Sequence, residues 1–160
     1  MQPNHFRTDC CGILNQLIEF FRGSRRFDTA MYLRFVVSEL DDDSERGLGI
    51  FHAAWKLRDE GSLFLHEKEH LEELRQWFNA HLKVPTRFTT SKPPYYRKKN
   101  KAISWFKDSA REHIARIREM VSILESHGIS VRMLKTERVG YIVYEDDHQV
   151  VAEPFSDVVC

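Results

Sequence analysis

The spacing of apolar positions changes several times along the chain, and each change predicts an element. Residues 31–37 form a short run rich in branched and aromatic side chains, which predicts a strand. Apolar residues three and four positions apart then predict a helix over about 48–57, ended by Gly61. A second helical stripe over about 67–82 stops before Pro85.

The last third of the chain predicts a βαβ unit followed by a hairpin. A short apolar run at 102–107 precedes a helix start at Asp108 or Ser109, and Gly128 ends that helix. Alternating residues from Ile129 onward predict three strands. If the strands at the two ends of the helix are parallel neighbours, the crossover between them is right-handed.

The sequence of the final hairpin predicts which residues pair across its two strands and that both faces of the hairpin are covered. A two-residue turn at 146–147 pairs Tyr144 with Gln149, and a four-residue turn over 145–148 fits the sequence equally well. Apolar side chains fall on both faces, so something covers each of them. We expect helices on one face and a second copy on the other, which makes a homodimer an expectation.

These elements predict an α+β fold with a mixed sheet and helices packed on one face. At 160 residues the chain has the length of one domain, which we place at 31–160, with a basic loop at about 86–101. Residues 1–30 read as an N-terminal extension whose apolar positions share a helical face, namely Ile13, Leu14, Leu17, Ile18 and Phe21. This helix either covers the domain's own core or meets a partner.

Composition narrows the range of partners and compartments. The 24 basic residues balance 24 acidic ones, so no global field draws the chain to nucleic acid or to an anionic membrane. No apolar run approaches the roughly 20 residues that cross a bilayer, and the start of the chain does not resemble a secretory signal. Cys10, Cys11 and Cys160 form no disulfide framework, which fits a reducing cytoplasm.

One local patch could still bind a polyanion. A proline-rich stretch interleaves aromatic rings with cations, so rings could stack on bases while cations contact phosphates. A solvated connecting loop explains the same composition, and we favour it. The candidate residues for nucleic acid or another polyanion are Lys92, Tyr95, Tyr96, Arg97, Lys98, Lys99 and Lys101.

The stretch His66-Glu67-Lys68-Glu69-His70 has the spacing of a zinc-binding HExxH helix. Metalloproteases keep this motif in a buried helix, whereas Lys68 and Glu69 indicate a solvated first turn. We therefore interpret His66, Glu67 and His70 as an accidental match, and expect neither a metal nor a cofactor.

A ligand pocket is the remaining chemical hypothesis. Strand ends beside helix starts receive anions, and a histidine near a carboxylate supports acid–base chemistry. The candidate ligand-binding residues beside the predicted sheet are Trp105, Lys107, His113, Tyr144, Glu145 and Gln149. No nucleophile elbow or phosphate loop accompanies them, so we assign no catalytic residue and lean against an enzyme.

Several stretches resemble a family of small uncharacterised bacterial proteins, of the kind carried on integron cassettes. They include Ile103-Ser-Trp-Phe-Lys107, Lys135-Thr-Glu-Arg-Val-Gly-Tyr-Ile-Val-Tyr-Glu145, Gln149-Val-Val-Ala-Glu-Pro-Phe155 and Val84-Pro-Thr-Arg-Phe88. The resemblance spans about residues 31–155 and implies a bacterial cytoplasmic setting, but no activity, substrate or catalytic residue.

The sequence therefore favours a protein that acts by binding a partner rather than by catalysis. We expect a non-enzymatic binding or adaptor domain with an unknown protein or small-molecule partner, and the alternative is a small enzyme or ligand-binding protein. Convergence of Trp105, Lys107, His113 and Tyr144 on one concave site favours the pocket, and a flat apolar patch favours the partner.

Overall fold

The computed structural model describes residues 30–40, 47–91 and 102–157. Its elements are β1 (Tyr32–Leu40), β2 (Gly47–Gly49), α2 (Ile50–Asp59), α3 (Leu65–His81), β3 (Ile103–Lys107), α4 (Arg111–Ser126), β4 (Val131–Thr136), β5 (Tyr141–Glu145) and β6 (Gln149–Glu153). The predicted N-terminal helix and the predicted polyanion-binding stretch lie outside the described residues. Within them, no helix has the length and apolar character that crossing a membrane requires.

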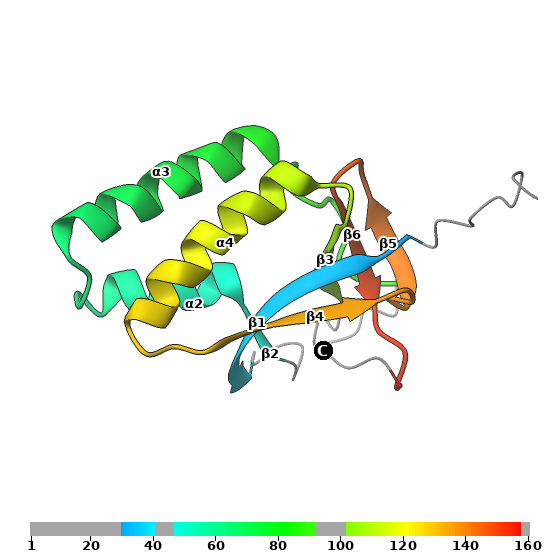
Figure 1. Cartoon of the computed structure of the whole chain (residues 1–160). Coiled ribbons are helices and arrows are strands. Elements are labelled where there is room, and N and C mark those ends of the chain that lie inside the picture. Colours follow the sequence, from blue (N-terminus) through cyan, green and yellow to red (C-terminus); the bar gives the residue numbers. More distant parts are fainter. Residues whose placement is uncertain (1–29, 41–46, 92–101, 158–160) are drawn as a thin grey trace, which may run out of the picture.

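The first strand organises the sheet. Along Tyr32–Val37, β1 pairs with β4, and on its other edge it pairs with β3 near its start and with β2 near its end. β3 then pairs with β6, and β6 with β5, so the order is β2-β1-β3-β6-β5 with β4 on the free edge of β1. Figure 1 shows β1 running through the middle of this arrangement.

The α+β class is confirmed, but the sheet is not mixed: every pairing among the described strands is antiparallel. β3 and β4, at the two ends of α4, run in the same direction because both are antiparallel to β1. They are not neighbours, since β1 lies between them. The predicted βαβ unit is therefore split by a strand from the start of the described chain, which local patterns cannot reveal.

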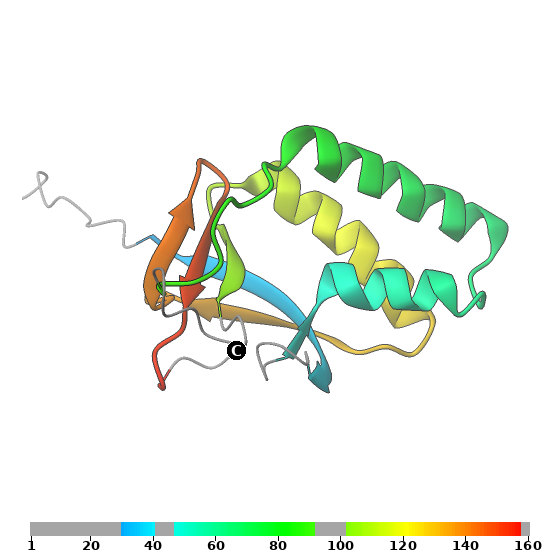
Figure 2. The same ribbon diagram turned by 180° about the vertical axis from the view of Figure 1, so that it is seen from behind.

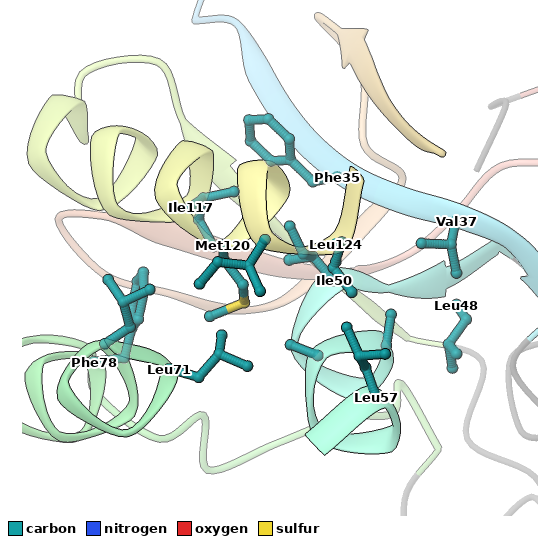
Figure 3. Packing of buried hydrophobic residues seen from close by; sticks show 14 of the residues in the cluster. Phe35, Val37, Leu48, Ile50, Leu57, Leu71, Phe78, Ile117, Met120 and Leu124 are labelled. Atoms are coloured by element: carbon teal, nitrogen blue, oxygen red, sulfur yellow. The ribbon is translucent and has the colours of Figure 1, made fainter. Parts of the chain in front are cut away.

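All three described helices pack on one face of the sheet, as the sequence predicts (Figures 1 and 2). Alternate residues of β1 point toward them, with Leu33, Phe35 and Val37 buried in a core shared with α2, α3 and α4. Figure 3 shows this core, in which Leu71 and Met120 have no exposed surface. Burial of each such side chain stabilises the fold by about 1.5–3 kcal/mol.

The opposite face carries a second, smaller core built around Trp105. Ile103, Val150 and Ala152 share it, with Tyr32, Leu134 and Phe155 partly buried against it. Trp105, Val150 and Ala152 have no exposed surface within a single chain. Burial of these three side chains therefore does not depend on a second copy, although the homodimer itself stays a prediction.

The predicted hairpin register is wrong. Tyr144 pairs with Val151 rather than Gln149, and an irregularity lies between Ile142 and Tyr144. The cause is the turn: the Asp146 carboxylate accepts the main-chain N–H groups of His148 and Gln149 at 2.8 and 2.9 Å. This side-chain bonding fixes a three-residue loop over 146–148, one residue longer than the first predicted turn and one residue shorter than the second.

Candidate functional site

The predicted ligand-binding side chains do not converge on one concave site. Trp105 is fully buried in the smaller core, on the sheet face opposite the helices. His113 lies at the start of α4 on the helical face. Because strand residues alternate between faces, Lys107 lies on the side of Trp105, whereas Gln149 shares the side of Phe106. The pocket predicted from these residues is therefore not formed.

Lys107 and Glu145 form an ion pair that links β3 to β5 across β6. Lys107 Nζ lies 2.7 Å from a Glu145 carboxylate oxygen, and the Lys107 side chain is 22% exposed. This hydrogen bond raises the pKa of Lys107, and the ammonium is held by its partner. The sequence argument expected a histidine near a carboxylate at this end of the sheet, whereas the cation that pairs with Glu145 is Lys107. The role of this pair is to hold strands together.

His113 joins three elements at one end of the helical layer. Its Nε2 lies 3.2 Å from the carbonyl oxygen of His81, at the end of α3. Its ring centroid lies 4.2 Å from that of His148 in the β5–β6 turn and 4.9 Å from that of Trp77. Burial lowers the pKa of His113, which favours the neutral imidazole in the folded state.

Tyr144 and Gln149 are both bound to Asp146. The Tyr144 hydroxyl donates to one carboxylate oxygen at 2.9 Å, and the Gln149 amide donates to the same oxygen at 3.2 Å. Burial opposes ionisation of Asp146, but hydrogen bonds led by the N–H groups of His148 and Gln149 outweigh it and lower its pKa. Asp146 is thus a turn-forming carboxylate, and sequence reasoning gave it only a place in the turn.

Glu67 of the HExxH stretch takes part in holding helix ends together. Its carboxylate accepts the Phe64 N–H at 3.0 Å, at the start of α3, and lies 2.8 Å from Nε2 of His127, after α4. The bond from His127 is the main reason that the pKa of Glu67 is lowered. His70 instead contacts Glu119 at 3.1 Å. Within the described ranges, no three His, Cys, Asp or Glu side chains form a group that could hold a metal ion.

The candidate site with the most apolar lining is a cleft that sequence reasoning did not find. It has a volume of about 440 Å³ and lies between the start of α2, strand β3 and the segment after α3. Buried side chains of Phe35, Ile50, Ile103 and Phe106 line it on the inside, and Phe51, Leu82, Pro85 and Phe88 line its sides. Its polar groups come from Arg34, His52, Ser104 and Gln149.

A second hollow of about 360 Å³ adjoins the first at Phe51, Leu82 and Pro85. Trp55, Phe78 and Val84 supply most of the rest of its apolar surface. Together the two hollows form a concave surface bounded by α2, the end of α3 and residues 82–88, which we call the α2 groove. Figure 2 shows α2 and α3 on the side of the molecule that carries it.

The wall of the α2 groove is held by two of the residues that the sequence assigned to ligand binding. Gln149 donates its side-chain N–H to the carbonyl oxygen of Lys83 at 2.6 Å, and His113 contacts the carbonyl of His81. Farther along, the buried Glu153 carboxylate accepts the Thr90 N–H at 2.7 Å. Gln149 and His113 are therefore positioning residues for the segment that lines the groove.

Arg34 shapes the inner end of the groove. Its guanidinium donates to the carbonyl oxygens of Gly47 at 2.9 Å and Ser104 at 3.2 Å. These carbonyls belong to β2 and β3, which meet the same edge of β1 at different points. Arg34 thus bridges the space where the two strands part, which keeps a polar group beside the apolar floor of the cleft.

The groove is built from residues far apart in sequence, so no local sequence motif predicts it. The one available signal is Trp55, a large aromatic on the predicted helix at 48–57 that remains only partly buried. Comparisons with protein-family models, with curated proteins and with solved structures found no match for this chain, so the resemblance to a bacterial family stays a prediction.

Proposed function

We propose that this chain is a non-enzymatic interaction domain that binds an apolar segment of a partner protein in the α2 groove. The observation that carries the proposal is the groove itself: two adjoining hollows with aromatic linings, open at the surface of the folded chain. Val84 on its rim is 82% exposed, and such apolar surface is typical of a docking site.

The size and shape of the groove suit side chains of a peptide. The inner hollow, at about 440 Å³, lies within the roughly 300–1,000 Å³ of sites that enclose organic groups. Grooves between helices recognise amphipathic segments through apolar residues spaced three or four apart. Two adjoining hollows would accept two successive anchors of that kind, one beside Phe106 and one beside Trp55.

The bonding of three titratable side chains supports a binding role over catalysis. Glu67 is bound to His127, Asp146 is bound to the turn that follows it, and His113 is packed among aromatic rings. Each is engaged in holding elements together. For its setting we propose the bacterial cytoplasm, on the strength of the family resemblance and the three cysteines.

Peptide selection tests the proposal directly. A phage library of random 12-residue peptides is panned against the immobilised full chain, and enriched peptides are synthesised and measured by fluorescence anisotropy. We expect binders that Val84→Asp weakens at least tenfold, because it places a carboxylate on the apolar rim. Val84 is almost fully exposed, so the substitution spares the fold.

The matched control is Leu65→Asp. Leu65 is 73% exposed at the start of α3 and does not line the groove. Binding that Leu65→Asp leaves unchanged and Val84→Asp weakens locates recognition in the groove. Peptides insensitive to Val84→Asp, or no binders at all, would refute the proposal.

A further inference from the structure

We infer that the partner segment is acidic, with carboxylates beside the apolar residues that enter the α2 groove. This inference rests on the proposed function and specifies the partner of the same site. It comes from the charged side chains among the described residues that line the groove, which are all cations.

The described residues that line the two hollows include Arg34, Arg75 and Lys83 but neither Asp nor Glu. Arg75 is already bound to Glu72 of its own helix, through Nε at 2.8 Å. Lys83 is exposed, and its main-chain carbonyl, rather than its ammonium, makes the contact with Gln149. Among the described residues the Lys83 ammonium makes no hydrogen bond or ion pair, so a partner's carboxylate can meet it at the rim.

The opposite side of Trp55 has a different character, which gives the partner a direction. There a shallow hollow is lined by His52, Lys56, Asp59 and Glu60. Its carboxylates would repel an acidic residue, whereas the Lys83 end would attract one. We therefore place the acidic part of the partner over Lys83 and its apolar part between Trp55 and Phe51.

The chain's own N-terminal segment is a poorer occupant. Its apolar stripe over 13–21 is followed by Arg22, Arg25 and Arg26, and these cations would meet a rim of the same sign. Charge complementarity thus favours a segment from a different chain.

The peptide selection described above also tests this inference, through the sequences it enriches. Groove-dependent peptides are expected to be net acidic. When the library is panned on the immobilised Lys83→Glu variant, the enriched peptides should no longer be preferentially acidic. The matched control is Lys68→Glu, on exposed α3 surface outside the groove, which should keep it. Replacing Asp and Glu by Asn and Gln in the best peptide should weaken binding by about 1.5- to 5-fold for each charge that pairs with the rim, as expected of exposed charge pairs.

The outcomes separate the two proposals. Groove-dependent peptides that are neutral or basic would overturn the acidic partner and leave the interaction domain standing, whereas absence of groove-dependent peptides would overturn both. Tighter binding by full-length Leu17→Asp would overturn the inference by assigning the groove to the N-terminal segment. A dimer that Val84→Asp dissociates, measured by light scattering, would overturn it by assigning the groove to a second copy.

Discussion

Replacing Gln149 by leucine should loosen the groove wall and lower the stability of the domain. Gln149 is 3% exposed, and its amide donates to the Lys83 carbonyl at 2.6 Å and to Asp146 at 3.2 Å. Leucine fills a similar space, so the effect reports the lost amide rather than a cavity. Asp146 keeps its bonds from the main chain and from Tyr144, so the turn should survive.

The magnitude follows from the two bonds. A neutral hydrogen bond contributes about 1 kcal/mol net, and one to a charged group about 1.5–3 kcal/mol. We expect Gln149→Leu to lower the free energy of unfolding by about 2.5–4 kcal/mol. For a domain of this size that corresponds to a fall in Tm of about 5–16 °C. Affinity for groove-dependent peptides should fall as well, because the wall at Lys83 is no longer held.

Urea unfolding followed by tryptophan fluorescence measures the loss in the free energy of unfolding. The slope of that free energy against urea concentration should stay constant if only stability changes. Gln76→Leu is the matched control: Gln76 also donates to a carboxylate, that of Glu72 at 3.2 Å, but on exposed helix surface. It should change stability by less than about 0.5 kcal/mol. A Gln149→Leu protein as stable as this control would show that the amide does not hold the wall.

Three further perturbations address other features of the fold. Gly140→Ala should destabilise the domain by at least about 3 kcal/mol in thermal unfolding. The reason is that φ of Gly140 is 120° and an added Cβ would clash with the Glu153 carbonyl oxygen. An unchanged Tm would contradict this close approach. Burial holds the pKa of His113 below the 6.5 of an exposed imidazole, so the unfolded chain gains a proton at that side chain first. Stability should fall as pH drops from about 6.5 through the lower folded pKa, and His113→Phe should reduce that fall in urea midpoints taken between about pH 5 and 8; parallel pH curves would argue against it. Met120→Ala should cost about 2–5 kcal/mol in urea unfolding, because this core side chain has no exposed surface, and a loss below about 1 kcal/mol would mean that the site collapses to fill the space.

Periodicity located most elements because helices and strands bury one side. The helices predicted over about 48–57 and 67–82 lie at Ile50–Asp59 and Leu65–His81. Gly128, predicted to end the next helix, has a φ of 78°, which glycine adopts readily. β2 escaped prediction because Gly47–Gly49 is too short and too rich in glycine to show alternation.

The strand pairing and the α2 groove were harder to predict from the sequence, because both depend on contacts between distant residues. The place of β1 between β3 and β4 depends on contacts between distant segments, and the hairpin register depends on one Asp146 side chain. Of the predicted ligand residues, Gln149 and His113 do contact the segment at the end of α3 that forms one wall of the α2 groove, but as supports for that wall. Polar residues near strand ends indicate where buried hydrogen bonds form. Those hydrogen bonds can hold the fold together rather than bind a ligand.

The central place of β1 has a consequence for synthesis. Tyr32 pairs with Thr136, roughly 100 positions later in the chain, and Leu33 pairs with both Phe106 and Lys135. During translation β1 emerges first and must wait for β3 and β4 before its edges are satisfied. Such distant pairing slows folding and leaves an unpaired apolar strand exposed to other chains meanwhile. We therefore expect the nascent chain to need protection until β4 has left the ribosome.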